Sequence, residues 1–280
     1  MILVAGATGN IGGPLVRQLV DAGADVRALS RDTGKVTAPT GVEVTRADLA
    51  QPASLEPAFA GGEALFLLAN TGGAVAGVLA AAQRVGVRRV VLVTSLLART
   101  HPESFVGRSA QEDERAVHDS GVQWTVLRPW EFASNVLAWA PMIRDTGVVS
   151  LPRTGLPSPT IHPADIAAVA ARALAEDGHG GLTYSLTGPE LLTPADKVNT
   201  LADVLGRALE LEERPDPQAL QRIEEQAPDE PSQGLMVPGV SGLASPDVLT
   251  TAHEVTGSPA RTFRQWAQEN THAFTPTRQT

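Results

Sequence analysis

The chain has 280 residues, of which 42% are hydrophobic and 19% are charged, and its formal net charge is −9. This composition is typical of a globular protein, and the acidic balance argues against nucleic acid or an anionic membrane as the main partner. The absence of cysteine excludes disulfides, thiolate metal sites and a cysteine nucleophile. No signal peptide and no apolar run long enough to span a bilayer are evident, so we expect a cytoplasmic protein.

The first half of the chain alternates short apolar runs with amphipathic stretches, which is the rhythm of a parallel sheet flanked by helices. The apolar runs are rich in valine and leucine and do not alternate with polar residues, as in strands buried on both faces. Gly23, Gly86 and Gly121 each follow a predicted helix, where a residue with positive φ often ends it. Strands are predicted at 2–5, 26–29, 42–44, 64–68, 90–93 and 124–127. Helices are predicted at 11–22, 54–59, 73–85 and 108–120.

Beyond Pro129 this rhythm loosens. A helix that begins at Pro194 is predicted from its proline in the first turn and from Thr193 as its N-cap. Residues 212–247 carry six prolines and several acids, so we interpret them as a mobile, partly helical excursion. Helices are also predicted at 132–143, at 163–175 and within 248–274, and strands at 148–151 and 182–186.

The strongest motif is GATGNIGG at residues 6–13, directly after a predicted strand and at the start of a predicted helix. A glycine turn lets backbone approach a pyrophosphate closely, and the helix N-terminus offers free N–H groups and a positive dipole end. In this context the motif predicts a dinucleotide site in a doubly wound, Rossmann-type α/β fold, with a purely structural turn as the alternative. The predicted contacts in the turn are Gly6, Thr8, Gly9, Asn10, Ile11 and Gly12.

The end of the second predicted strand selects the cofactor. NAD-specific sites place an acid there, whereas this strand is followed by Arg31 and then Lys35, which can pair with a 2′-phosphate. Asp32 argues against this preference, because it is an acid near the same strand end, although it follows the arginine. We therefore expect NADPH/NADP+ rather than NADH. Asp48 and Leu49 follow the third strand, where they could contact adenine, and Asp48 could equally cap a helix.

With these motifs in place, the sequence resembles the NmrA-like group of atypical short-chain dehydrogenases. The resemblance implies an NADP(H)-binding core at 1–150, with core elements returning at about 160–190. It also implies a smaller substrate-covering part at 191–280, in which 212–247 form a candidate lid. The matching stretches are GATGNIGG, SRDTGK at 30–35, GVRRVVLVTS at 86–95, SGVQWTVLRPWEFASN at 120–135, IHPADIAAVAARAL at 161–174, SLTGPELLTPADKV at 185–198 and HEVTGSPARTFRQWA at 253–267.

One departure from this group bears on the chemistry. Short-chain reductases protonate the carbonyl oxygen with the tyrosine of a Tyr-x-x-x-Lys pair, and this chain has one tyrosine, two lysines and no such pair. Where the group would place it, residues 107–113 read GRSAQED. Ser95 ends the fifth strand and could polarise a carbonyl, but it is too weak an acid to replace tyrosine. Either the protein is not a reductase, or its acid comes from elsewhere.

Five further residues are candidates for cofactor or substrate contact. Asn70 could touch the nicotinamide ribose or cap its strand, and the resemblance implies that backbone at Pro129 meets the nicotinamide carboxamide. His101 could titrate near neutrality, or it is an exposed loop histidine. Trp130 and Phe132 could wall a planar substrate or belong to the core. Six scattered histidines indicate no metal site, and the oligomeric state stays open.

Three functions are compatible with these residues. The first is an NADPH-dependent ketoreductase for a large aromatic small molecule, in which substrate or water provides the proton. Here the chain resembles tyrosine-less ketoreductases of simocyclinone-type angucyclinone antibiotic biosynthesis, which implies reduction of the 7-oxo group of a tetracyclic polyketide. The second is a quinone reductase, and the third is a non-catalytic NADP(H)-sensing regulator.

Overall fold

The computed structural model describes residues 1–69, 75–151, 156–214 and 245–275. The chain divides into two compact units, and neither is one continuous stretch of sequence. The first unit comprises Met1–Pro129, Pro163–Leu186 and Thr251–Ser258. The second unit comprises Trp130–His162, Thr187–Thr250 and Pro259–Thr280.

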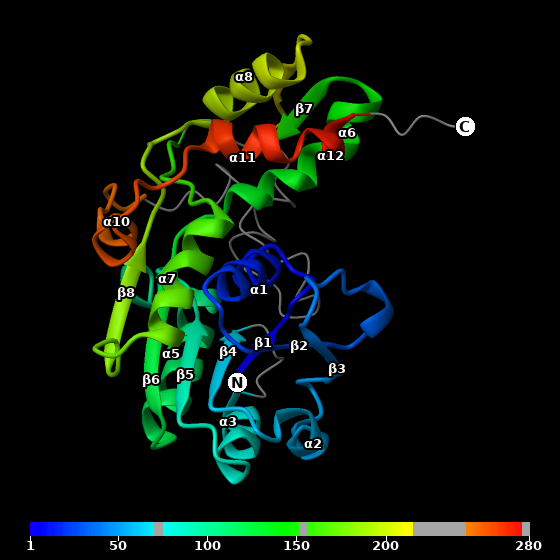
Figure 1. Ribbon diagram of the computed structural model, residues 1–280. Coiled ribbons are helices and arrows are strands. Elements are labelled where there is room, and N and C mark those ends of the chain that lie inside the picture. The colour runs from blue at the N-terminus through cyan, green and yellow to red at the C-terminus, as the bar shows by residue number, and fades with distance from the viewer. Residues whose placement is uncertain (70–74, 152–155, 215–244, 276–280) are drawn as a thin grey trace. The chain divides into compact units, whose positions relative to one another are not determined.

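The first unit is built on a parallel sheet. Among the described residues, seven strands stand in the order β3-β2-β1-β4-β5-β6-β8, and every neighbouring pair is parallel (Figure 1). Because β1 lies between β2 and β4, the winding direction of the sheet changes beside β1, and doubly wound sheets bind ligands at this point. The predicted Rossmann-type α/β fold is confirmed. The strands are β1 Ile2–Ala5, β2 Val26–Ser30, β3 Glu43–Arg46, β4 Ala64–Leu68, β5 Arg89–Val93, β6 Gln123–Pro129 and β8 Leu182–Leu186.

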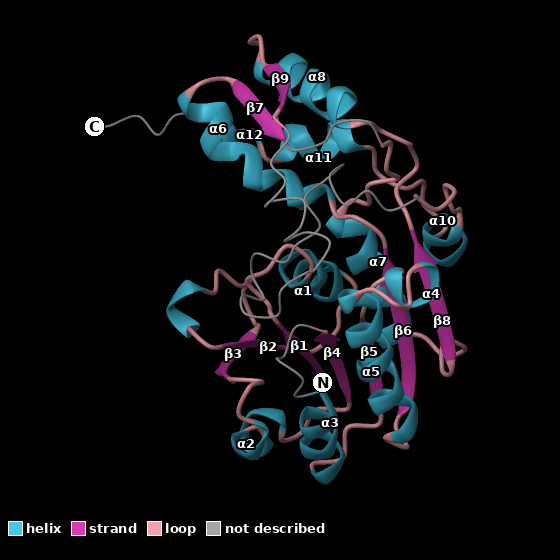
Figure 2. Cartoon of the chain, turned by 180° about the vertical axis from the view of Figure 1, so that it is seen from behind, coloured by secondary structure: helices cyan, strands magenta, loops and turns pink. Residues whose placement is uncertain are grey.

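Helices cover both faces of this sheet (Figures 1 and 2). α1 and α7 pack together on one face, and α2, α3 and α5 share a core on the other. The central strands are buried from both sides, which explains why their apolar runs do not alternate with polar residues. Gly23, Gly86 and Gly121 have φ angles of 78°, 89° and 75°, as predicted for helix ends. The helices are α1 Gly12–Asp21, α2 Glu56–Phe59, α3 Val75–Arg84, α4 Leu97–Thr100, α5 Phe105–Asp119, α7 Pro163–Ala175 and α10 Thr251–Thr256.

In the second unit, the helix predicted at 132–143 has a different form. A 3₁₀ stretch, η3 (Ala133–Trp139), is followed by α6 (Ala140–Asp145). Pro141 has no amide N–H to donate to the Leu137 carbonyl, so α-helical hydrogen bonding cannot run through this point. The helix α8 (Pro194–Leu205) begins as predicted, with Thr193 and Asp196 forming a capping box.

The core of the second unit is aromatic. Trp266 stacks on Phe263 and meets Phe274 edge to face, and Trp139 is buried in the same cluster. These side chains come from α11 (Phe263–Glu269), α12 (Thr271–Phe274) and η3. A short parallel pair, β7 (Val148–Leu151) and β9 (Glu210–Glu213), completes the unit.

The candidate lid at 212–247 lies outside the described residues except at its two ends, where residues 212–213 belong to β9. Its closure over substrate stays a prediction. No helix in the described part of the chain is long and apolar enough to cross a membrane. The same residues bring together no group of three side chains that could hold a metal ion.

Candidate functional site

The predicted contacts in the first unit gather along one edge of the sheet. All strands of this sheet are parallel, so their carboxyl ends meet at the same edge. Asn70, predicted after β4, lies outside the described residues. Along the edge, the segments after β1, β2, β3 and β5 and the last residue of β6 carry Gly6, Arg31, Asp48, Ser95 and Pro129.

The turn after β1 brings backbone atoms too close together for side chains. Gly6 has a φ of +67°, and the N–H of Gly9 donates to the Gly6 carbonyl oxygen over 2.8 Å. A Cβ on Gly12 would lie 2.2 Å from that same oxygen, so only glycine fits at this position. Gly6 and Gly9 are exposed while Gly12 is buried. The turn therefore presents bare backbone to a ligand.

The first turn of α1 leaves backbone amides open. Within the described chain, the N–H groups of Asn10, Ile11 and Gly12 meet no acceptor, and no side chain caps the helix. Thr8 and Asn10 are exposed beside them. Free amides at the positive end of a helix dipole are a binding site for phosphate groups. These residues therefore fit the pyrophosphate of a dinucleotide.

At the end of β2, the acidic residue is engaged in its own turn. The carboxylate of Asp32 accepts the N–H of Gly34 over 3.1 Å, and it lies 3.3 Å from the ammonium of Lys35. Arg31 is exposed, and it makes no ion pair with any described residue. Since the acid is engaged within its own turn and Arg31 is exposed, this end of the strand favours a 2′-phosphate over free ribose hydroxyls.

Arg31→Ala is expected to weaken NADPH binding about tenfold or more, because pairing to a charged 2′-phosphate is worth about 1.5–3 kcal/mol. NADH lacks this phosphate, so its binding should change little. Fluorescence titration with each cofactor measures the difference. Arg88→Ala is the matched control, since Arg88 is an exposed arginine before the amino end of β5, at the opposite edge of the sheet. Equal losses for both cofactors in Arg31→Ala would remove Arg31 from the phosphate site.

Asp48 caps the turn that follows β3. Its carboxylate accepts the N–H of Ala50 and the side-chain amide of Gln51, each over 3.1 Å. Leu49 packs against the hydrophobic core that α2, α3 and α5 share. Asp48 therefore caps a turn and not a helix, since the next helical element begins at Pro52 with Gln51 at its N-cap. Contact of Asp48 and Leu49 with adenine stays a prediction.

Ser95 and His101 lie on either side of α4 (Leu97–Thr100), in the chain after β5. The Oγ of Ser95 accepts the N–H of Leu97 over 3.2 Å, which leaves its own O–H able to polarise a carbonyl. The Nδ1 of His101 lies 3.0 Å from Thr100 Oγ1, and the His101 carbonyl accepts the hydroxyl of Ser104 over 2.7 Å. Both candidates therefore take part in local turns, and their contacts with substrate stay predictions.

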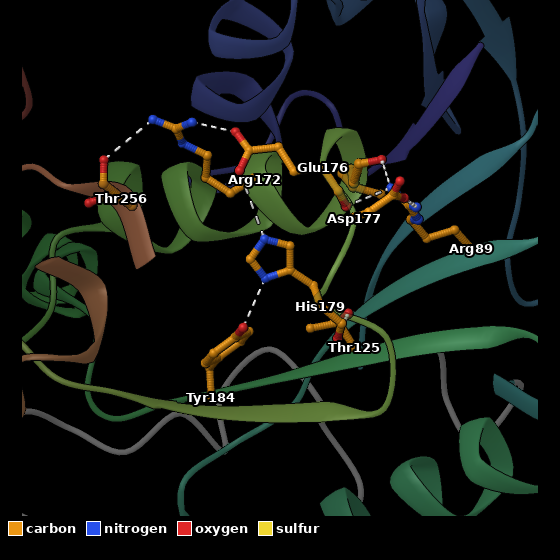
Figure 3. Close-up of polar contacts among 9 residues, drawn as sticks. Arg89, Thr125, Arg172, Glu176, Asp177, His179, Tyr184 and Thr256 are labelled. Atoms are coloured by element: carbon orange, nitrogen blue, oxygen red, sulfur yellow. Dashed lines mark hydrogen bonds and ion pairs between the residues drawn. The ribbon is translucent and has the colours of Figure 1, made fainter. Parts of the chain in front are cut away.

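The tyrosine and the lysines have partners other than one another. The hydroxyl of Tyr184 lies 2.8 Å from His179 Nδ1, in a cluster at the end of α7 (Figure 3). Burial raises the pKa of Tyr184, which makes it a weaker acid. In the second unit, Lys197 Nζ contacts Glu131 Oε1 at 2.7 Å, and Lys35 pairs with Asp32. No Tyr–Lys acid is therefore assembled from these residues.

The helix α5, where such a pair would stand, is built differently. A Cβ on Gly107 would lie 2.1 Å from the His101 carbonyl oxygen, so no side chain fits there. One turn later, Gln111 donates its side-chain N–H to the Ala98 carbonyl over 2.9 Å. The first turns of α5 thus pack directly on the backbone of α4 and the loop after it. This close packing leaves no place for a tyrosine at residue 107.

Asp113 on α5 is partly buried, and burial together with the charges of Glu112 and Glu114 raises its pKa to about 6. The stability that comes from its protonated form is complete below the ordinary value of 3.8 and is lost as the pH rises through about 6. Asp113→Asn should therefore raise the free energy of unfolding by about 1–2 kcal/mol near pH 7.5, after allowance for solvent screening, and change little near pH 4. Thermal unfolding at both pH values tests this, with the exposed Asp119→Asn as control. An equal gain at both pH values would exclude Asp113 titration as its cause.

Glu114 and Arg128 form an ion pair in the first unit, and neither was selected as a candidate from the sequence. Glu114 of α5 is buried, and its Oε1 accepts the Nε–H of Arg128 over 2.8 Å, while its other oxygen contacts Arg128 Nη2. This hydrogen bonding raises the pKa of the Arg128 guanidinium. The sequence feature that could have indicated this pair is Arg128, which lies inside the apolar run before Pro129. A charge in a buried strand needs a partner of opposite charge.

In the second unit, Trp130 and Phe132 differ in their surroundings. Trp130 is buried, and its indole N–H donates to Ser158 Oγ over 3.0 Å. Phe132 is half-buried and forms an isolated bridge with Ile161. Trp130 thus takes part in the interior of this unit, and substrate contact by either ring stays a prediction.

Known proteins resemble this chain along nearly its whole length. Residues 6–177 match the NAD(P)H-binding family. The chain is 40% identical to a (4-alkanoyl-5-oxo-2,5-dihydrofuran-3-yl)methyl phosphate reductase of Streptomyces griseus subsp. griseus, across 99% of this chain and 100% of the relative. It is 33% identical to an NAD(P)H azoreductase of Xenophilus azovorans, across 98% of this chain and 99% of the relative.

A solved structure is also similar. It is an NADPH-dependent quinone oxidoreductase of Escherichia coli in complex with NADPH, with a TM-score of 0.79 and 26% identity. The match covers 96% of this chain and 99% of that one. Together with the curated relatives, it extends the likeness well beyond the nucleotide-binding turn.

Proposed function

This chain belongs to the NAD(P)H-binding family and is an NADPH-dependent oxidoreductase, and from that premise we propose that it reduces a conjugated, electron-poor small molecule without a side-chain acid. The substrate class we favour is the 4-acyl-5-oxo-2,5-dihydrofuran ring, a lactone whose carbon–carbon double bond is conjugated with two carbonyl groups. Within the family, the sequence motifs favour the NmrA-like group.

The observation that carries this proposal is the construction of α5. Its first turn packs on backbone at Gly107, and the chain's tyrosine is engaged with His179. A ketone reduced without an acid leaves a full charge on one oxygen. A conjugated acceptor spreads that charge over several atoms, so water can deliver the proton afterwards, and no strong acid is required.

The reaction balances with one NADPH and one proton per substrate. When bound, NADPH supplies a hydride, which adds to the ring carbon β to the two carbonyl groups. The electrons of the double bond move to the carbonyl oxygens, and a proton from water completes the saturated ring. Ser95 donates its O–H to the oxygen on which charge collects, and the free amides of residues 10–12 hold the pyrophosphate.

The activities named for the relatives support this class. The relatives are a reductase of an acylated dihydrofuranone phosphate, an azoreductase and a quinone oxidoreductase. Acyl-dihydrofuranone, azo and quinone groups are all unsaturated systems that can delocalise an added pair of electrons. The relative with 40% identity favours the furanone over the other two.

A ketone flanked by a phenol is the second candidate. The same missing acid favours it, because the phenol is hydrogen-bonded to the carbonyl and can provide the proton. The angucyclinone 7-oxo group predicted from the sequence belongs to this class of ketone. A sensor that binds NADP(H) without turnover remains the non-enzymatic alternative. The assay below separates all three, because faster reduction of the phenol-flanked ketone than of the furanone would favour the second candidate.

The test is steady-state oxidation of NADPH with a panel of acceptors. The panel contains a 4-alkanoyl-5-oxo-2,5-dihydrofuran with its methyl phosphate, a benzoquinone, a phenol-flanked tetracyclic ketone and an isolated aryl ketone. The furanone and the quinone should react, and the isolated ketone should be slower by about 10²-fold or more, which is the usual contribution of a general acid. Fast reduction of the isolated ketone would reveal an acid, and tight NADPH binding without turnover of any acceptor would favour the sensor.

A further inference from the structure

The carboxylate of Glu114 binds the residue that follows β5 and a residue near the end of β6. Its Oε1 accepts the hydroxyl of Thr94 over 2.8 Å and the Nε–H of Arg128 over 2.8 Å. Thr94 immediately precedes Ser95, and Arg128 immediately precedes Pro129. One side chain therefore contacts the neighbours of both the substrate-side serine and the proline at the end of β6.

Backbone hydrogen bonds continue this connection on either side of Ser95. The N–H of Thr94 donates to the Leu127 carbonyl over 2.8 Å, and the N–H of Leu96 donates to the Pro129 carbonyl over 2.9 Å. Ser95 is thus the one residue between two cross-strand bonds. A shift of Glu114 would change the spacing of β5 and β6 where these bonds end.

We propose that Glu114 is a positioning residue, which sets the distance between Ser95 and the backbone at Pro129 by binding Thr94 and Arg128 at the same time. This inference rests on the proposed function, in which substrate and nicotinamide meet at this edge. Glu114 does not itself touch either of them in this scheme. It acts through the two strands.

The burial of the ion pair between Glu114 and Arg128 agrees with a role in positioning the two strands. The side chain of Glu114 is 5% exposed and that of Arg128 is 21% exposed. A buried ion pair often contributes no more stability than apolar side chains of the same volume, because desolvating the charges offsets their attraction. Its directional bonds, in contrast, allow only one arrangement of the two strands. An apolar contact would hold the strands together without defining that arrangement.

Thr94 provides the most selective test, because two substitutions distinguish the effect of losing its hydroxyl from the effect of changing the shape of its side chain. Thr94→Val keeps the volume and loses the donor, whereas Thr94→Ser keeps the donor. We expect kcat with a benzoquinone acceptor to fall several-fold in Thr94→Val and to stay near the wild-type value in Thr94→Ser. Glu114→Gln should lower kcat about 10–100-fold, since misplacement by about 1 Å can cost 10²-fold. Glu112→Gln, an exposed carboxylate on the same helix, is the matched control.

Two further readouts separate positioning from general damage to the fold. The Kd for NADPH should stay within about threefold in every variant, because the amides and Arg31 that hold the other parts of the cofactor are unchanged. The fluorescence lifetime of bound NADPH should shorten in Glu114→Gln and Thr94→Val, since a less constrained nicotinamide relaxes faster. This second readout needs no acceptor, so it tests the inference even if the proposed substrates are not reduced.

The inference is overturned if kcat and lifetime are unchanged in Thr94→Val. It is also overturned if Thr94→Val and Thr94→Ser lose activity equally, because that pattern indicates a packing role. Should Glu114→Gln fail to fold, the two threonine variants decide by themselves. Wild-type protein that reduces none of the acceptors would contradict the proposed function, and the lifetimes would still decide the role of Glu114.

Discussion

Gly12→Ala is expected to destabilise the first unit by about 3 kcal/mol and to weaken NADPH binding about 100-fold or more. The new Cβ would lie 2.2 Å from the Gly6 carbonyl oxygen and 2.7 Å from its carbon. Both are backbone atoms in a turn that is itself held by a hydrogen bond, so they cannot move aside as a flexible side chain would. The turn has to open, and the amides of residues 10–12 then no longer converge on the pyrophosphate. Urea unfolding and a fluorescence titration of NADPH measure the two effects.

The matched control is the neighbouring glycine. In Gly13→Ala the Cβ would meet the Ala7 carbonyl oxygen at 3.5 Å and the Arg17 guanidinium at 3.8 Å, which are ordinary contacts. Both substitutions add the same methyl group near the start of α1, so the change in helix propensity is similar. The fold should survive Gly13→Ala. If Gly12→Ala bound NADPH as tightly as the wild type, the close turn would not be needed for the cofactor.

Lys197→Met is the second substitution with a large expected effect, and it should lower the free energy of unfolding of the second unit by about 3–5 kcal/mol. The side chains of Lys197 and Glu131 are 0% and 4% exposed, and their charged atoms are 2.7 Å apart. Methionine has a similar length but no charge, so it leaves the carboxylate of Glu131 buried without its cation. Chemical denaturation followed by tryptophan fluorescence reports on this unit, because Trp139 and Trp266 lie in its core.

Two further variants show whether the loss of stability comes from the unpaired carboxylate of Glu131. Adding Glu131→Leu to Lys197→Met should recover most of the stability, since an apolar pair can replace a buried ion pair. Arg264→Met is the control, because it breaks an exposed ion pair. Its partner Asp203 is on α8, as Lys197 is, and the charged atoms of this pair are 2.8 Å apart. That loss should stay below about 1 kcal/mol. Equal losses for Lys197→Met and Arg264→Met would mean that burial does not matter here.

Local sequence signals were sufficient for the elements that locate the nucleotide site. The strands β1 and β4 have the predicted bounds, because short apolar runs that do not alternate with polar residues are typical of strands buried on both faces. The strands β7 and β8 also have the predicted bounds. Helix α8 was equally predictable, since Thr193 and the proline after it form a local start signal. The bounds and type of an element were less predictable where backbone hydrogen bonding decides them. The helix predicted at 132–143 is instead η3 followed by α6, because Pro141 cannot donate the α-helical hydrogen bond.

The sequence by itself determined that this protein has a glycine turn for a dinucleotide and no Tyr-x-x-x-Lys acid, because both depend on residue identity and short spacing. Only the tertiary structure decided which charges meet. Asp32 accepts a hydrogen bond from Gly34 within its own turn, Glu114 joins residues 14 and 20 positions away, and Lys197 reaches Glu131 across 66 positions. Hydrophobic periodicity says which face of an element is buried, but it does not say which polar groups share that interior. Their partners are chosen by packing and by the cost of leaving a buried charge unpaired, and both arise only when distant segments come together.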